Sequence, residues 1–111
     1  MRTQSQITVV DEVPLVPVKE GVQKRVVSDS DTLSIAEYFW EKDHVTPGDH
    51  AHGWDTANYI VSGSFEVTLD GRTVVLGPGD SYTVPAGTPR TMRALEDGSY
   101  ILVMARGTAP S

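Results

Sequence analysis

The sequence contains no cysteine, and no run of about 18 apolar residues occurs anywhere in its 111 residues. Without cysteine there is neither a disulfide framework nor a thiolate metal site, so a bound metal would need histidine, carboxylate or hydroxyl ligands. The first six residues, MRTQSQ, are not followed by an apolar stretch long enough for a signal peptide. We therefore expect a soluble cytoplasmic protein that makes no membrane contact.

Positive charge is also scarce. The chain has 9 Lys and Arg against 15 Asp and Glu, which gives a formal net charge of -6. The basic residues are scattered, so they form no stripe that could neutralise a row of phosphates. Nucleic acid is thus excluded as an expected partner.

Apolar residues at helical spacing are missing as well. Short alternating runs rich in β-branched and aromatic residues recur instead, and the 10 Gly and 7 Pro of the chain separate many of them. Turn signals return about every ten residues, which is typical of a sandwich or barrel. The length allows a single domain, and the sequence predicts that this domain is all-β.

The pattern also gives the expected strands and turns. Asp70-Gly71 is a two-residue hairpin signal. We expect the last two strands to pair with each other across residues 96–98. The expected strands cover residues 33–41, 58–63, 64–69, 72–76, 81–84, 90–95 and 99–105.

The amino-terminal part differs from the rest. Pro14 and Pro17 interrupt a β-prone run, and proline cannot donate a ladder hydrogen bond, so this piece belongs at an edge or in an extended arm. We divide the chain into an arm over residues 1–30, a barrel over 31–107 and a flexible tail over 108–111. The arm is expected to pack on the partner chain of a homodimer.

Two blocks of sequence, PGDHAHGWDTANYIVSG over residues 47–63 and LGPGDSYTVPAGTPR over 76–90, resemble the two signatures of the cupin family. The resemblance covers about half of the chain and implies a jelly-roll barrel, also called a double-stranded β-helix. The matching positions are His50, His52 and Gly63 in the first block and Gly79, Pro85 and Gly87 in the second.

The resemblance implies that His50 and His52 face the barrel interior, and on a strand two residues this far apart do share a face. In the family they bind a divalent metal together with a glutamate and a third histidine. This sequence has Thr56 at the glutamate position and Arg90 at the position of the third histidine. A metal held by His50 and His52 alone would lack ligands.

Whether a transition metal such as Zn, Mn, Fe or Ni binds is left open by the sequence. Asp55 and His44 are the candidates for an additional ligand, although alternation on a strand turns Asp55 to the opposite face unless a bulge intervenes. No organic cofactor is expected.

Arg90 is better suited to a carboxylate than to a dication, because a guanidinium is always charged and binds carboxylates with two hydrogen bonds. We therefore expect an isomerase, lyase or cyclase that acts on an acidic or enolisable small molecule. In this hypothesis His50 or His52 carries a proton and Arg90 holds the anion, so these three are the candidate catalytic residues. A dioxygenase would need a complete metal triad.

The remaining pocket residues follow from parity and from residue type. Positions 56, 58 and 60 should share the inward face, and position 92 should follow Arg90 inward. Aromatic residues indicate an organic ligand with a flat or apolar surface. The candidate substrate-binding residues are Arg90, Thr56, Asn58, Met92, Trp54 and Tyr82, with Ile60, Tyr38 and Trp40 as further wall residues.

Two alternatives remain at this point. The chain could be a noncatalytic binding module that senses a small ligand or a metal. Arg90 could also be a surface residue paired with Asp80 or Glu66, which is a common location for arginine.

Overall fold

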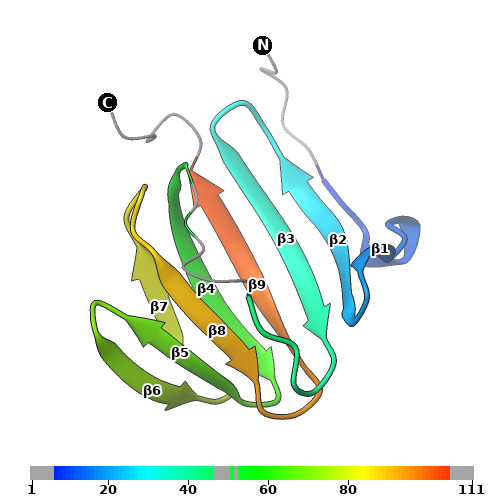
Figure 1. Ribbon diagram of the computed structural model, residues 1–111. Coiled ribbons are helices and arrows are strands. Elements are labelled where there is room, and N and C mark those ends of the chain that lie inside the picture. Colours follow the sequence, from blue (N-terminus) through cyan, green and yellow to red (C-terminus); the bar gives the residue numbers. More distant parts are fainter. Residues whose placement is uncertain (1–6, 47–50, 52, 106–111) are drawn as a thin grey trace.

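The computed structural model describes residues 7–46, 51 and 53–105, and strands dominate this part of the chain (Figure 1). Within it lie one short 3-10 helix, η1, and nine strands. No helix among the described residues is long and apolar enough to cross a membrane. The elements are η1 (Val10–Glu12), β1 (Val16–Lys19), β2 (Val22–Asp29), β3 (Leu33–Trp40), β4 (Asp55–Ser62), β5 (Phe65–Leu69), β6 (Arg72–Leu76), β7 (Ser81–Val84), β8 (Arg90–Ala94) and β9 (Gly98–Ala105).

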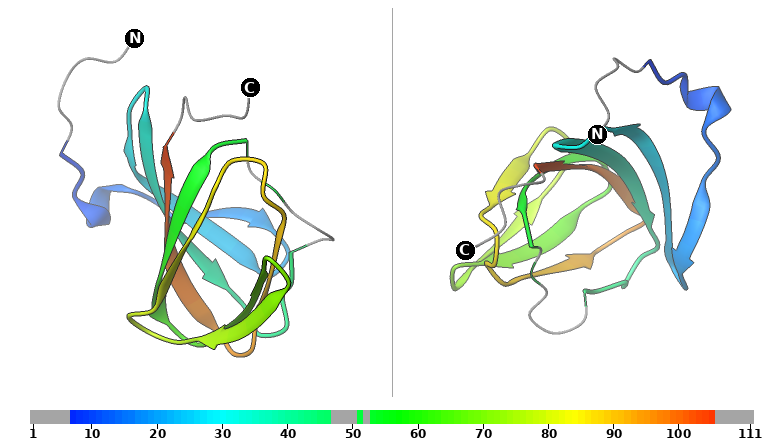
Figure 2. Two further views of the ribbon diagram at one scale, coloured as in Figure 1. Left: turned by 90° about the vertical axis from the view of Figure 1, so that its left-hand side faces the viewer. Right: turned by 90° about the horizontal axis from the view of Figure 1, so that it is seen from above.

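The strands form two antiparallel sheets that face each other (Figure 2). The larger sheet has the order β1-β2-β3-β9-β4-β7, and the smaller has the order β6-β5-β8. On β4, Thr56, Asn58 and Ile60 are buried while the residues between them are more exposed, as alternation on a strand requires. The expected all-β fold is confirmed.

Two turns explain why the strand ends fall where they do. Asp70 and Gly71 both have positive φ, 54° and 76°, and they join β5 to β6 in a two-residue hairpin, as the sequence predicts. Gly63 joins β4 to β5 with φ 78°, and a Cβ at this position would lie 2.6 Å from the carbonyl oxygen of Asp97. Only glycine therefore fits this corner without strain.

The expected pairing of the last two strands across residues 96–98 is wrong. β8 pairs with β5 in the smaller sheet, whereas β9 lies between β3 and β4 in the larger one. The turn at Glu96-Asp97-Gly98 thus carries the chain from one sheet to the other. Turn residues show that the chain reverses, but they do not show which strands the following strand pairs with.

The amino-terminal segment is part of the larger sheet. β1 is its edge strand and contains Pro17, as the proline content predicts. β2, a strand that the sequence analysis did not predict, pairs with β3 from Val22↔Trp40 to Asp29↔Ser34. Residues 22–29 therefore belong to the barrel sheet of this chain and not to a separate arm; the packing of residues 1–30 on a second chain stays a prediction.

The apolar core fills the space between the two sheets. Its aromatic members meet edge to face: the ring of Trp40 lies 5.8 Å from Phe65 and 5.6 Å from Tyr100. Phe65, Ile60 and Met92 are fully buried. The core residues are Val22, Trp40, Ile60, Phe65, Val67, Met92, Ala94, Tyr100 and Leu102.

Candidate ligand-binding site

A cavity of about 230 Å³ lies where the two sheets separate. One wall is the inner face of β1, β2, β3 and β9. The other wall consists of the start of β8 and the segment before the first signature block, which runs beside β8 through the bridge Val45↔Arg93. The lining residues are Val18, Lys19, Val22, Tyr38, Trp40, His44, Thr46, Arg90, Tyr100 and Leu102.

Arg90 is the buried charged residue of the cavity wall. It is the first residue of β8, it pairs with Leu69 of β5, and it is only 4% exposed. This burial contradicts the alternative of a surface ion pair with Asp80 or Glu66. A cation inside a barrel acts through a low effective dielectric constant, so it attracts an anionic ligand more strongly than a surface arginine would.

The charge of this guanidinium acts on three tyrosines. Burial raises the pKa of Tyr38, Tyr82 and Tyr100 above the ordinary value for tyrosine, and the positive charge of Arg90 offsets part of that rise. All three side chains therefore remain neutral phenols at physiological pH. Tyr38 and Tyr100 stack face to face, with centroids 5.4 Å apart and planes inclined by 7°, and give the cavity a flat aromatic wall.

Thr56 and Asn58 are buried polar residues on β4. Thr56 is 4% exposed and Asn58 is 0% exposed, and Asn58 lies opposite Leu102 of the cavity wall. Neither the Thr56 hydroxyl nor the Asn58 amide oxygen and nitrogen has a hydrogen-bond partner among the residues that the structure describes. A buried polar group without a partner costs about 1–3 kcal/mol, so this pair points to a polar ligand or to water inside the barrel.

His44 and Thr46 come from the segment beside β8. The backbone carbonyl of His44 accepts a hydrogen bond from the Ala94 N–H at 2.9 Å, and its ring meets Trp40 edge to face at 4.6 Å. Burial lowers the pKa of His44, and the positive charge of Lys19 lowers it further. The Thr46 hydroxyl accepts a hydrogen bond from the Met92 N–H at 3.1 Å, which ties the segment to β8.

Other candidate residues lie outside the cavity wall. Met92 is fully buried, and its sulfur accepts a hydrogen bond from the Tyr82 hydroxyl at 3.3 Å. Trp54 is half-buried and is not among the lining residues. His50 and His52 lie outside the described residues.

The described residues do not fit the divalent metal site that the family resemblance implies. Thr56 and Arg90 stand where a carboxylate and an imidazole are needed, and a guanidinium repels a dication. Asp55 is exposed, and its carboxylate accepts the Ala86 N–H at 2.8 Å, so the structure does not bring it to the inward face. No group of three His, Cys, Asp or Glu suited to a metal occurs among the residues placed by the structure. Metal binding by His50 and His52 stays a prediction.

Tyr100, Val18 and Lys19 line the cavity but were not predicted from the sequence. Strand alternation could have predicted Tyr100, because it lies two residues from Leu102 and shares the inward face of β9 with it. No comparable signal exists for Val18 and Lys19, since the strand that carries them was expected to lie outside the barrel. The site therefore includes the edge strand of the larger sheet.

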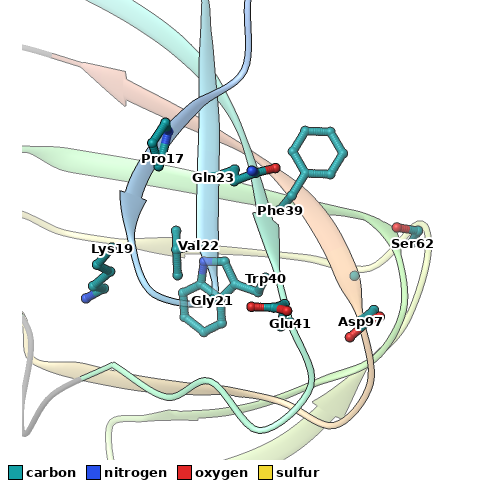
Figure 3. A pocket seen from close by; sticks show the side chains of 11 residues that line it. Pro17, Lys19, Gly21, Val22, Gln23, Phe39, Trp40, Glu41, Ser62 and Asp97 are labelled. Carbon is teal, nitrogen blue, oxygen red and sulfur yellow. The ribbon is translucent and has the colours of Figure 1, made fainter.

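A larger groove of about 500 Å³ lies at the base of the β1–β2 hairpin (Figure 3). Its lining includes the acidic residues Glu41 and Asp97, and Asp97 accepts a hydrogen bond from the Lys42 N–H at 2.8 Å. Arg90, Thr56 and Asn58 do not line it. Thr56 and Asn58 do not line the smaller cavity either, so the buried Arg90 is the feature that marks that cavity as the candidate site.

Comparisons with known proteins agree with this architecture. A family model described as a cupin domain matches residues 38–105. The chain is 30% identical over 94 residues to the pectin degradation protein KdgF of Dickeya dadantii, covering 83% of this chain and 84% of that protein. The structure of KdgF from Halomonas sp. is 29% identical, with a TM-score of 0.84 over 93% of this chain and 96% of that one. An RmlC-like cupin from Shewanella frigidimarina, 22% identical, shares the fold with a TM-score of 0.85 over 95% of this chain and 94% of its own.

Proposed function

This chain belongs to the cupin family, and we propose that it is an isomerase acting on a small carboxylate-bearing molecule in the barrel cavity. One observation carries the proposal: a buried arginine lines a cavity in which no described lining residue is acidic. The whole chain has a formal net charge of -6, so a positive cavity is not a consequence of overall charge. A carboxylate is the ligand that a guanidinium binds best, through two parallel hydrogen bonds.

The substrate class follows from this pocket together with the relatives. One similar protein is named for pectin degradation, and a second carries the same protein name, KdgF. Pectin is an acidic polysaccharide built from galacturonate. Cleavage of such a chain by elimination leaves a sugar acid with a C4=C5 double bond next to the carboxylate. A cavity of about 230 Å³ suits one such unit and excludes a polymer.

The proposed reaction opens the ring of this unsaturated sugar acid. A base removes the proton of the C1 hydroxyl, the C1=O bond forms, and the C1–O5 bond breaks. O5 remains as an enolate conjugated with the carboxylate, and C4 then takes up a proton to give the keto acid. No atom is gained or lost, so the step is an isomerisation and needs no redox partner.

Each role has a candidate in this chain. Arg90 holds the carboxylate and the adjacent enolate, whose added negative charge strengthens the interaction in the transition state. His50 or His52 carries the proton, as the sequence analysis predicts. Thr56 and Asn58 offer hydrogen bonds to sugar hydroxyls, and the stacked Tyr38 and Tyr100 pack on a face of the ring.

Turnover of unsaturated galacturonate, followed by the loss of ultraviolet absorbance of its conjugated double bond, tests the proposal. We expect the wild-type protein to accelerate the loss over buffer. We expect His50→Ala, His52→Ala and Arg90→Ala to reduce it by about 100-fold or more, with circular dichroism spectra like that of the wild type. Wild-type activity in all three folded variants would exclude this site.

The alternative function is a noncatalytic binding module. Thermal stabilisation by sugar acids without any conversion would favour it over the isomerase. The same titration with Zn, Mn, Fe and Ni salts examines the metal-sensing form of this alternative.

A further inference from the structure

The edge strand β1 brings a second cation to the cavity. In an undisturbed ladder with Pro17 opposite Gln23, Val18 would pair with Val22 and Lys19 with Gly21. The register shifts between Pro17 and Lys19, so Lys19 pairs with Val22 instead. A β-bulge of this kind re-aims a side chain, and such bulges are common beside active sites. The shift puts Lys19 on the inner face with Val22, where both residues line the cavity.

The surroundings leave this ammonium available to a ligand. Lys19 is exposed and forms no ion pair with any residue in the described part of the chain. Its charge acts on His44 across the cavity wall. Lys19 and Val22 line the larger groove as well as the cavity, and Figure 3 shows Lys19 at the end of the groove away from Ser62 and Asp97.

The cavity thus has one cation from each wall, Arg90 from β8 and Lys19 from β1. A monocarboxylate held by Arg90 would leave Lys19 without a counter-charge. We propose that Lys19 is a specificity-determining residue that binds a second oxyanion of the ligand while Arg90 binds its carboxylate. This inference rests on the proposed function, because it takes Arg90 as the first anchor.

The second oxyanion has two sources with the same chemistry. It is either a second carboxylate of the ligand or the enolate oxygen that forms in the proposed ring opening. In the first case Lys19 strengthens binding of the ground state. In the second it strengthens only the transition state, so kcat falls on its removal and KM does not rise.

Comparing the binding of galactonate and galactarate tests the first source, because both are linear six-carbon acids and galactarate has one more carboxylate. Lys19→Met removes the charge but keeps the length of the side chain, and Lys42→Met is the matched control, because Lys42 does not line the cavity. Isothermal titration is expected to show about tenfold tighter binding of galactarate by the wild-type protein and by Lys42→Met. Lys19→Met should bind both acids about equally.

The second experiment measures the turnover of unsaturated galacturonate. A fall in kcat of about tenfold in Lys19→Met, with KM changed by less than about twofold, assigns Lys19 to the enolate. The inference is overturned if both the binding ratio and kcat of Lys19→Met stay within about twofold of Lys42→Met. A preference for galactarate that depends on Lys19, without any turnover, would instead support the role of Lys19 in binding a second oxyanion and contradict the proposed isomerase function.

Discussion

The barrel has a closed side and an open side, and the same alternation of inward and outward side chains serves a different role on each. On the closed side, β4 and β5 turn Ile60, Phe65 and Val67 toward each other, and these apolar side chains are almost completely buried. On the open side, β1 to β3 diverge from β8, and the gap between them is lined by cations, phenols and an imidazole. The closed side therefore contributes apolar burial alone, whereas the open side shares core residues such as Trp40 and Tyr100 with a cavity that is available to a ligand.

Asn58 lies where the two sides meet. It shares the inward face of β4 with Ile60, yet its amide has no hydrogen-bond partner among the described residues. Its register partner, Leu102, belongs to both the core and the cavity wall. A residue that weakens the core in this way is expected where binding is favoured over stability.

Phe65→Ala tests the closed side and should have the largest effect. Phe65 is fully buried, and its ring packs edge to face against Trp40 and Tyr100. We expect the free energy of unfolding, measured by chemical denaturation, to fall by about 3–5 kcal/mol. A loss below about 1 kcal/mol would mean that this side does not hold the main core.

Asn58→Leu tests the boundary between the sides. The substitution keeps the size of the side chain and removes an amide that has no partner in the described structure. We expect the free energy of unfolding to rise by about 1–3 kcal/mol and the affinity for galacturonate to fall. A destabilised variant would show that the amide is hydrogen-bonded in solution without a ligand.

His44→Gln tests the open side and should have the smallest effect. Because the pKa of His44 is lowered in the folded state, mainly by burial, the unfolded chain binds the proton more readily as the pH falls below about 6.5. His44 therefore lowers stability progressively as the pH falls through this range, and the variant should lack that component. Thermal denaturation of both proteins at pH about 7.5 and about 5.5 measures the difference. The same pH dependence in both proteins would show that His44 is not the group responsible.

The sequence predicts more of the closed side than of the open side. Alternation at positions 56, 58 and 60, the Asp70-Gly71 hairpin and the proline-glycine turns are local signals, and the strands that they predict are present. The inward positions of Thr56 and Asn58 also follow from strand alternation, whereas that of Arg90 was expected from the family resemblance. By contrast, the position of β1 depends on pairing with β2, on a bulge and on the curvature of a six-stranded sheet. None of these can be read from neighbouring residues, and Lys19 was missed for that reason.

The crystal structure of the protein soaked with galacturonate tests the central claim most directly, because that claim concerns where a carboxylate binds. The account predicts sugar-acid density inside the barrel, with the carboxylate on the Arg90 guanidinium and a ring face against Tyr38 or Tyr100. It predicts an empty barrel in crystals of Arg90→Met soaked in the same way. Density for the acid in the groove near Asp97, or an unchanged complex in the variant, would contradict it.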